Sequence, residues 1–207
     1  MQDLAIRAAA IAEMRQPTLD LTQQFLQVLP LEIEAGQPVI AAIQQDETEA
    51  VVCFRVQGEK FFLALHLSLE PVIKAHSAEI EIGSRVSLLI RHPERGQLAI
   101  PETLAPIRRR NFGVHFEPSQ NETDDVEKKI EFLLQSLEPH RDFMDEIATR
   151  TQLRLQIAYY GYVSQMWGLH LEVETLRRLA EWNIELDVDL YAGGKELLPW
   201  DFAAQSH

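Results

Sequence analysis

The end of the chain contains two segments in which apolar and polar residues alternate, separated by a segment with helical periodicity. Residues 153–160 and residues 184–191 both alternate in this way, which is typical of a strand with one buried face. In the second segment, Ile184, Leu186, Val188 and Leu190 are the residues expected to be buried. The segment around Leu179 has helical spacing, and Asn183 is suited to end it. We therefore expect a strand–helix–strand crossover unit in a mixed sheet.

Two helices are expected immediately before this unit. The apolar residues of the first recur on one helical face: Val126, Ile130, Leu133, Leu134 and Leu137. Either Asn121 or Thr123 is suited to cap its beginning. Pro139 separates it from a second helical segment, in which Phe143, Met144 and Ile147 are expected to point inward.

The first half of the chain predicts a helix followed by strands. The helix has Leu4, Ala8, Ile11 and Met14 at helical spacing and is ended by Pro17, and a weaker helical segment spans residues 21–29. Residues 50–56 and 60–67 are rich in Val, Phe and Leu and are joined by Gln57-Gly58-Glu59, which predicts a β-hairpin. Further strands are expected at residues 85–91 and 111–116, with a turn at 93–96.

These patterns predict an α+β protein, in which amphipathic helices pack on a mixed β-sheet. A stretch with little periodicity between Pro101 and Pro106 suggests a boundary near residue 105. Residues 1–105 then form a helix and hairpin subdomain, and residues 106–207 form an α+β domain. At 207 residues, the two halves can equally pack as one domain.

The charge balance argues against several classes of partner. The chain has 19 basic and 32 acidic residues and a formal net charge of −13, so most of its surface should repel nucleic-acid phosphates and anionic membranes. Cys53 is the only cysteine and lies in an apolar run, which excludes an internal disulfide and favours a buried, unreactive thiol. No leader or membrane-spanning segment is evident, so we expect a cytoplasmic protein.

Four segments of the C-terminal half carry a family resemblance: Leu137-Glu138-Pro139 to Ile147, Gly168-Leu169-His170-Leu171, Leu176-Arg177-Arg178-Leu179-Ala180 and Leu186-Asp187-Val188-Asp189-Leu190-Tyr191. Together they resemble an uncharacterised bacterial family, domain of unknown function 4279. The resemblance covers about residues 107–191. It implies a helix ending in a Leu-x-Pro turn, a strand, a helix and a closing strand. It implies no catalytic residue and no cofactor.

Two groups of carboxylates are weak candidates for a metal site or for acid–base chemistry. Glu185, Asp187 and Asp189 share one face of the last strand and are oxygen ligands suited to Mg²⁺ or Ca²⁺. Asp142 and Glu146 are four residues apart on a helix, near His140 and Asp145. A solvated polar face is the favoured interpretation of the first group, and no metal is assigned to either.

Two other segments are candidate binding sites. Arg108, Arg109 and Arg110 form the one basic cluster of an acidic chain, and guanidinium groups hold carboxylates or phosphates. Internal ion pairing is the alternative interpretation. Tyr160, Tyr162 and Trp167 belong to an aromatic-rich segment, and aromatic side chains of this kind contribute strongly to protein interfaces.

The sequence favours a non-enzymatic protein-interaction module whose partner has a basic surface, with toxin neutralisation in the manner of an immunity protein as one version. The first alternative is a small-molecule- or metal-binding domain, or a hydrolase, that uses the acidic residues. The second is a self-associating structural protein, for which an exposed edge strand of the hairpin would serve. The sequence does not decide whether the chain is an enzyme, but the lack of a recognisable catalytic motif argues against it.

Overall fold

The computed structural model describes residues 2–91, 100–104, 107–110, 113–118 and 122–197. It is an α+β protein with a mixed-sheet architecture, as the sequence predicts. The chain divides into two compact units, of which the N-terminal unit comprises residues 1–82, 160–165 and 192–207 and the C-terminal unit residues 83–159 and 166–191. The boundary predicted near residue 105 stays a prediction, because residues 105 and 106 lie outside the described residues.

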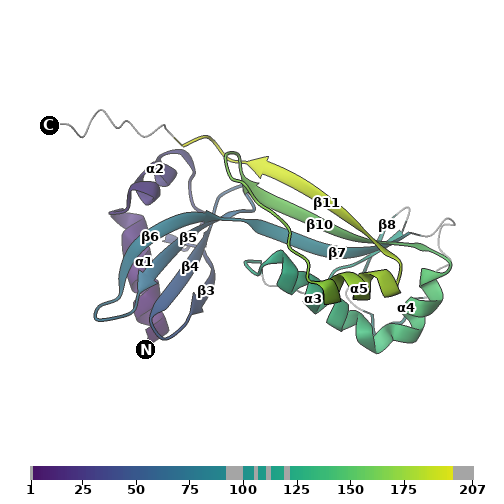
Figure 1. The fold of residues 1–207 in the computed structure, drawn as a ribbon. Coiled ribbons are helices and arrows are strands. Elements are labelled where there is room, and N and C mark those ends of the chain that lie inside the picture. Colours follow the sequence, from purple (N-terminus) through teal and green to yellow (C-terminus); the bar gives the residue numbers. More distant parts are fainter. Residues whose placement is uncertain (1, 92–99, 105–106, 111–112, 119–121, 198–207) are drawn as a thin grey trace. The chain divides into compact units, whose positions relative to one another are not determined.

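The N-terminal unit is a four-stranded antiparallel sheet with helices on one face (Figure 1). Its order is β3-β4-β5-β6. The elements are α1 (Gln2–Arg15), α2 (Asp20–Val28), β3 (Ile40–Gln45), β4 (Glu49–Arg55), β5 (Phe62–Ser68) and β6 (Lys74–Glu81). A short ribbon of β1 (Ile33–Glu34) and β2 (Gln37–Pro38) turns at Ala35 and Gly36, which both have positive φ. The predicted hairpin is confirmed as β4 and β5, and both of its strands are internal to the sheet.

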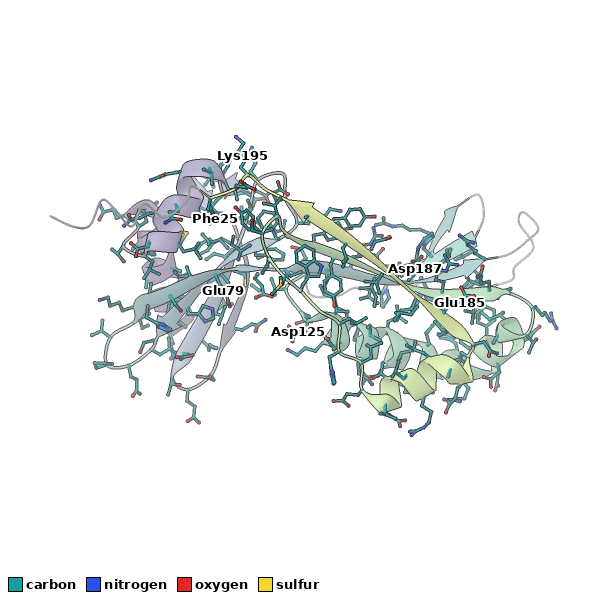
Figure 2. All side chains as sticks on the ribbon, turned by 45° about the horizontal axis from the view of Figure 1, so that its top comes forward. Phe25, Glu79, Asp125, Glu185, Asp187 and Lys195 are labelled. Carbon is teal, nitrogen blue, oxygen red and sulfur yellow. The ribbon has the colours of Figure 1, made fainter. Side chains whose placement is uncertain are left out.

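The core of this unit lies between the helices and the alternate side chains of the central strands. Val52, Phe54, Leu63 and Leu65 pack with Phe25 of α2, which Figure 2 labels. The first helix is present where it was predicted, but its buried face is different. Ile6, Ala10 and Met14 are buried, whereas Leu4 is exposed. The run of alanines makes several faces of this helix similarly apolar, so sequence periodicity alone does not select the one that packs.

The C-terminal unit is built on a five-stranded sheet of order β11-β10-β7-β9-β8. Its helices lie together on one face of that sheet (Figure 1). The elements are β7 (Gly83–Arg91), β8 (Ile107–Arg110), β9 (Gly113–Phe116), α3 (Val126–Leu137), η1 (Glu138–His140), α4 (Arg141–Ala148), β10 (Gln152–Tyr162), α5 (Val173–Glu181) and β11 (Ile184–Gly193).

The predicted apolar faces of α3 and β10 are confirmed. All five predicted apolar residues of α3 are buried, and so are Leu153, Leu155, Ile157 and Tyr159 of β10. The residue at the N-cap of α3 is Asp125, and its side chain makes no capping hydrogen bond. Neither predicted cap therefore holds this position: Thr123 is buried two residues earlier, and Asn121 lies outside the described residues. Asn183 ends the segment after α5 with a φ of 50°, a conformation that asparagine tolerates better than most residues.

Strands β10 and β11 run parallel, with α5 as the crossover between them. Arg154 near the start of β10 reaches Glu185 and Asp187 near the start of β11, and the Val163 amide after β10 donates to the Gly193 carbonyl at the end of β11. The starts of the two strands thus lie side by side, and so do their ends, which requires that the strands run parallel. This is the predicted strand–helix–strand unit. Among the described residues, no helix combines the length and the apolar composition needed to cross a membrane.

Candidate functional site

The outer strand β11 carries a row of exposed apolar side chains. The sequence predicts that Leu186, Val188 and Leu190 are buried, and this is wrong: they are 43%, 38% and 60% exposed. Only Ile184, the first residue of the strand, is buried. The reason is the position of β11 at the edge of the sheet, where a strand has a neighbour on one side only. We call Leu186, Val188 and Leu190 the apolar edge.

The two faces of β11 differ in character. Arg154 forms ion pairs with Glu185 and Asp187, each at 3.2 Å between nitrogen and oxygen, so these carboxylates, which Figure 2 labels, lie on the same sheet face as Arg154. Side chains two residues apart on a strand point to the same face, so Asp189 shares the face of Glu185 and Asp187. Asp189 makes no ion pair among the described residues. The apolar edge therefore lies on the opposite face, the one to which Leu155 and Ile157 belong. We call Glu185, Asp187 and Asp189 the acidic face.

The acidic face is held by a cation that the chain itself supplies. Gln152 donates to Glu185 at 2.7 Å, and this bond, followed by the bonds from Arg154, lowers the pKa of the Glu185 carboxyl. Arg154 thus occupies the position between Glu185 and Asp187 that a metal ion would need. The second candidate pair, Asp142 and Glu146, is exposed on α4, where Glu146 pairs with Arg150. Within the described ranges, no three His, Cys, Asp or Glu side chains converge as metal ligands.

The three candidate aromatic residues lie in different environments. Tyr160 is half-buried on β10, with the Lys60 ammonium 4.1 Å from its ring centroid. Tyr162 is 6% exposed, packs edge-on against Phe61 and donates its hydroxyl hydrogen to the Lys195 carbonyl. Its prediction as a surface contact is corrected, because its ring belongs to the core of the N-terminal unit. Trp167 is half-buried, and its indole N–H finds no acceptor among the described residues.

The basic cluster is on the opposite edge of the same sheet. Residues Arg108 to Arg110 form most of β8, which pairs with β9 in the register Arg108 to His115. Arg108 is exposed, while the side chains of Arg109 and Arg110 lie outside the described part of the chain. Its use as an anion-binding site stays a prediction.

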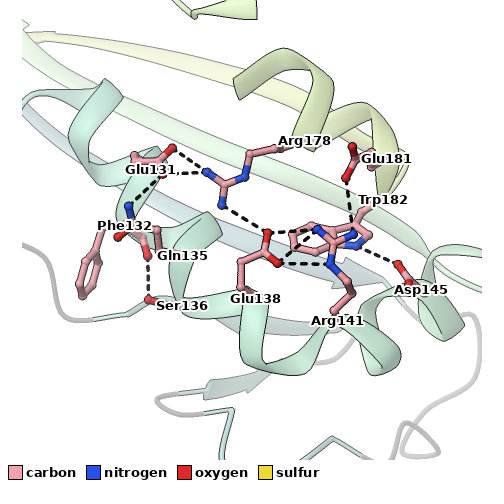
Figure 3. Close-up of polar contacts among 10 residues, drawn as sticks. All are labelled: Glu131, Phe132, Gln135, Ser136, Glu138, Arg141, Asp145, Arg178, Glu181 and Trp182. Carbon is pink, nitrogen blue, oxygen red and sulfur yellow. Dashed lines mark hydrogen bonds and ion pairs between the residues drawn. The ribbon is translucent and has the colours of Figure 1, made fainter. Parts of the chain in front are cut away.

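A charged network fixes the helices of the C-terminal unit to one another (Figure 3). Arg178 of α5 donates to both oxygens of Glu131 on α3, at 2.7 and 2.8 Å, and forms an ion pair with Glu138. Arg178 is thus directed toward α3 and η1 and not toward Glu174, four residues earlier on α5. Glu174 pairs with Arg177 instead, because that arginine stays on the outer surface of the helix.

The same network continues to α4 through Trp182. Its indole N–H donates to Asp145 at 2.9 Å, and the Arg141 guanidinium lies 5.3 Å from its ring centroid. Asp145, part of a candidate acid–base group, is thus occupied by a structural hydrogen bond. An open groove lies beside α3. Two of the carboxylates that line it make structural hydrogen bonds, because Glu127 accepts one from the His170 amide and Glu131 accepts one from Arg178.

Lys129 is a buried cation that sequence reasoning missed. It lies on α3 with 1% of its surface exposed, and its ammonium group donates to the Ser84 carbonyl and hydroxyl and to the Glu122 carbonyl at 2.8 to 2.9 Å. Burial lowers its pKa to about 8, against the raising effect of Asp124, Glu122 and Asp125. In the sequence, Lys129 stands next to Ile130, at the border of the apolar face of α3. This position is the one sequence feature that could have indicated its burial.

Cys53 lies in the sheet of the N-terminal unit as a small buried side chain. Burial, followed by the charges of Glu81 and Glu79, raises the pKa of its thiol to about 12. The thiolate that nucleophilic chemistry requires is therefore strongly disfavoured.

Comparison with known proteins gives one family match. Residues 94–193 match the family described as "Domain of unknown function (DUF4279)", a range that includes the segment in which the sequence resembles this family. No curated protein and no solved structure matches the chain. The matched range contains η1, α4, α5 and the acidic face and apolar edge of β11. Residues 94–193 of this chain are therefore similar to the DUF4279 family.

Proposed function

We propose that this protein is a non-enzymatic interaction module that binds a protein with a basic surface. The observation that carries the proposal is the apolar edge of β11, three neighbouring exposed aliphatic residues at an unpaired sheet edge. Exposed edges of this kind are usually shortened, charged or covered, because they pair readily with other chains. An edge that keeps its aliphatic side chains is consistent with a binding role.

The charge of the molecule supports a basic partner. A net charge of −13 accelerates association with positively charged proteins and opposes association with acidic ones. The carboxylates of β11 bring this preference to the edge itself. Neutralisation of a basic toxin is one form that such binding takes, and the identity of the partner decides between that form and others.

Capture from a native lysate tests the proposal. The full chain is immobilised, and we expect it to retain a protein of basic isoelectric point that is released when the salt concentration rises, because salt screens exposed charges. The retained protein is then purified and its affinity for the chain is measured by calorimetry. A lysate from which no protein is retained above background, at low salt and with the chain folded, contradicts the proposal.

A further inference from the structure

We propose that β11 takes up an extended basic segment of its partner as an additional strand of the five-stranded sheet. This inference rests on the protein-binding function proposed above and adds the mode of binding and the chemistry of the segment. Strand addition is an established way for an extended peptide to bind a sheet edge, with main-chain hydrogen bonds giving affinity and alternate side chains giving specificity.

The first support is the free main-chain edge of β11. The Gly193 carbonyl accepts the Val163 amide and so points toward the side of β10. In a strand the N–H and C=O of one residue point to the same side and those of the next residue to the other side, so the N–H and C=O groups of Leu186, Val188 and Leu190 point away from β10. β11 is the outermost strand of the order β11-β10-β7-β9-β8, so among the described residues no further strand pairs with this side of it.

The second support is the separation of charge and apolar surface between the two faces of β11. An added strand places alternate side chains beside the acidic face and beside the apolar edge. Lys or Arg at one set of positions lies next to Asp187 and Asp189, and Val, Ile or Leu at the other set lies next to Val188. Favourable cross-strand pairs of this kind stabilise the added strand.

A second copy of this chain is a poorer occupant of the same edge. If two β11 strands paired with their apolar edges on one face, their acidic faces would also coincide, and carboxylates of the two copies would lie beside each other. Like charges in such cross-strand positions are destabilising. Arg154 offsets part of the charge of Glu185 and Asp187, but Asp189 has no ion-pair partner among the described residues.

The opposite edge of the sheet provides an internal contrast. Strand β8 consists of Ile107 followed by three arginines. Arg108 is exposed on that strand, and its positive charge opposes a basic segment there, so the same segment favours β11 over β8.

Binding of a defined peptide to the full chain tests the inference. The probe is a fluorescent, capped peptide of sequence Lys-Val-Lys-Val-Lys-Val-Lys, and binding is followed by anisotropy at low and high salt. Two further peptides carry N-methyl groups on every second amide, one on the valines and one on the lysines. A strand bonds to its neighbour through one set of amides only, so strand addition predicts that one methylated peptide binds and the other does not. Equal binding of both overturns strand addition.

Two variants locate the site, with a matched control. Val188→Lys adds a cation to the apolar edge and should weaken the peptide about tenfold. Val72→Lys makes the same change at an exposed position of the N-terminal unit, 71% exposed, and should leave the affinity unchanged. Asp189→Asn should weaken the peptide several-fold and reduce the salt dependence. Each variant is first shown to be folded by circular dichroism.

The outcomes separate this inference from the function on which it rests. If the partner captured from lysate binds Val188→Lys as tightly as the unmodified chain, the interaction is real but β11 is not its site. If light scattering shows a dimer that Val188→Lys dissociates and Val72→Lys does not, a second copy occupies the edge and the basic segment is excluded. If no peptide binds and the captured partner is retained, only the strand-addition mode fails.

Discussion

At the scale of single residues, the ionisable side chains that the fold buries have structural roles. The three N–H donors of the Lys129 ammonium each have an acceptor, two of them main-chain carbonyls. Such a group joins the start of β7 to the segment before α3. Removing it takes one donor from each of those carbonyls, and a buried acceptor that loses its donor costs about 1–3 kcal/mol.

We expect Lys129→Met to lower the free energy of unfolding by about 1–3 kcal/mol at pH 7. The matched control is Lys128→Met, because Lys128 is the exposed neighbour and pairs with Asp125 on the surface. Urea denaturation of the three proteins measures the difference. Equal stability of the two variants would show that the hydrogen bonds of Lys129 are dispensable.

Lys129 also makes stability depend on pH in a defined direction. Its pKa is about 8 in the fold, below its ordinary value of 10.5, so between these values the unfolded chain holds a proton that the folded chain has lost. The free energy of unfolding attributable to this group therefore rises with pH across that window. The stability difference between the unmodified chain and Lys129→Met should increase from about pH 8 to about pH 10. A constant or shrinking difference contradicts the assignment.

Cys53 should be inert in the folded protein. Its raised pKa leaves almost no thiolate near neutral pH, and the side chain is buried. With a chromogenic disulfide reagent, we expect the thiol to react at the rate of global or local unfolding, and at once in strong denaturant. Fast labelling of the native protein would show that the sheet opens readily at β4.

At the scale of elements, α1 supplies the cap that α2 lacks. Leu19, the residue at the N-cap of α2, offers no side-chain hydrogen bond. Glu13 of α1 is buried and accepts the main-chain amides of Thr18 and Leu19 and the Thr18 hydroxyl at 2.8 to 2.9 Å. A carboxylate here also complements the dipole of α2.

Replacing Glu13 by Ala should therefore destabilise the protein by about 1–2 kcal/mol. Glu47→Ala is the control, since Glu47 is exposed in the turn between β3 and β4. Thermal unfolding followed by circular dichroism distinguishes the two. Glu13→Gln should recover part of the loss, because an amide oxygen still accepts main-chain hydrogen bonds.

Helix α5 offers a similar comparison between adjacent arginines. Arg178, with its side chain 16% exposed, joins α3 and η1, whereas Arg177, at 59%, pairs with Glu174 on its own helix. We expect Arg178→Gln to cost about 1–3 kcal/mol of stability and Arg177→Gln less than about 0.5 kcal/mol. Similar effects of the two changes would show that the network of Figure 3 adds little beyond a surface pair.

The elements differ in how far the sequence alone defines them. Helix α3 is predictable from its five apolar residues at helical spacing, and β10 from strict alternation, because both face the core along their whole length. The exposure of Val188 is not predictable in this way. Alternation identifies the two faces of a strand but does not indicate whether the strand is central or at the edge of the sheet. The partners of Arg178 and Lys129 likewise depend on contacts distant in sequence.

At the scale of the whole molecule, the chain returns to its N-terminal unit after β11. Gly194 has a φ of 85°, and a Cβ atom there would lie 3.0 Å from Phe61 and from Tyr162. Its amide donates to Glu59. A residue near the end of the chain thus packs against a turn formed by residues distant in sequence.

Gly194→Ala should consequently destabilise the protein by about 1–2 kcal/mol or more, through the positive φ and the close contacts. Gly36→Ala is the control, because Gly36 also has a positive φ but a Cβ atom added there would meet no other atom within 4 Å. The excess loss at Gly194 over Gly36, measured by chemical denaturation, gives the contribution of the close approach. No excess would show that Phe61 and Tyr162 shift without cost.

The central position of β7 limits how this unit can be inherited or transplanted. The family match begins at residue 94, after β7 ends at Arg91, yet β7 lies between β10 and β9 in the sheet. A gene fragment cut at the borders of the match would lack β7, so β10 and β9 would have no strand between them. The core would also lose the buried side chains of Val86, Leu88 and Ile90. The smallest fragment that keeps all five strands must therefore begin before the matched segment, at or before the start of β7.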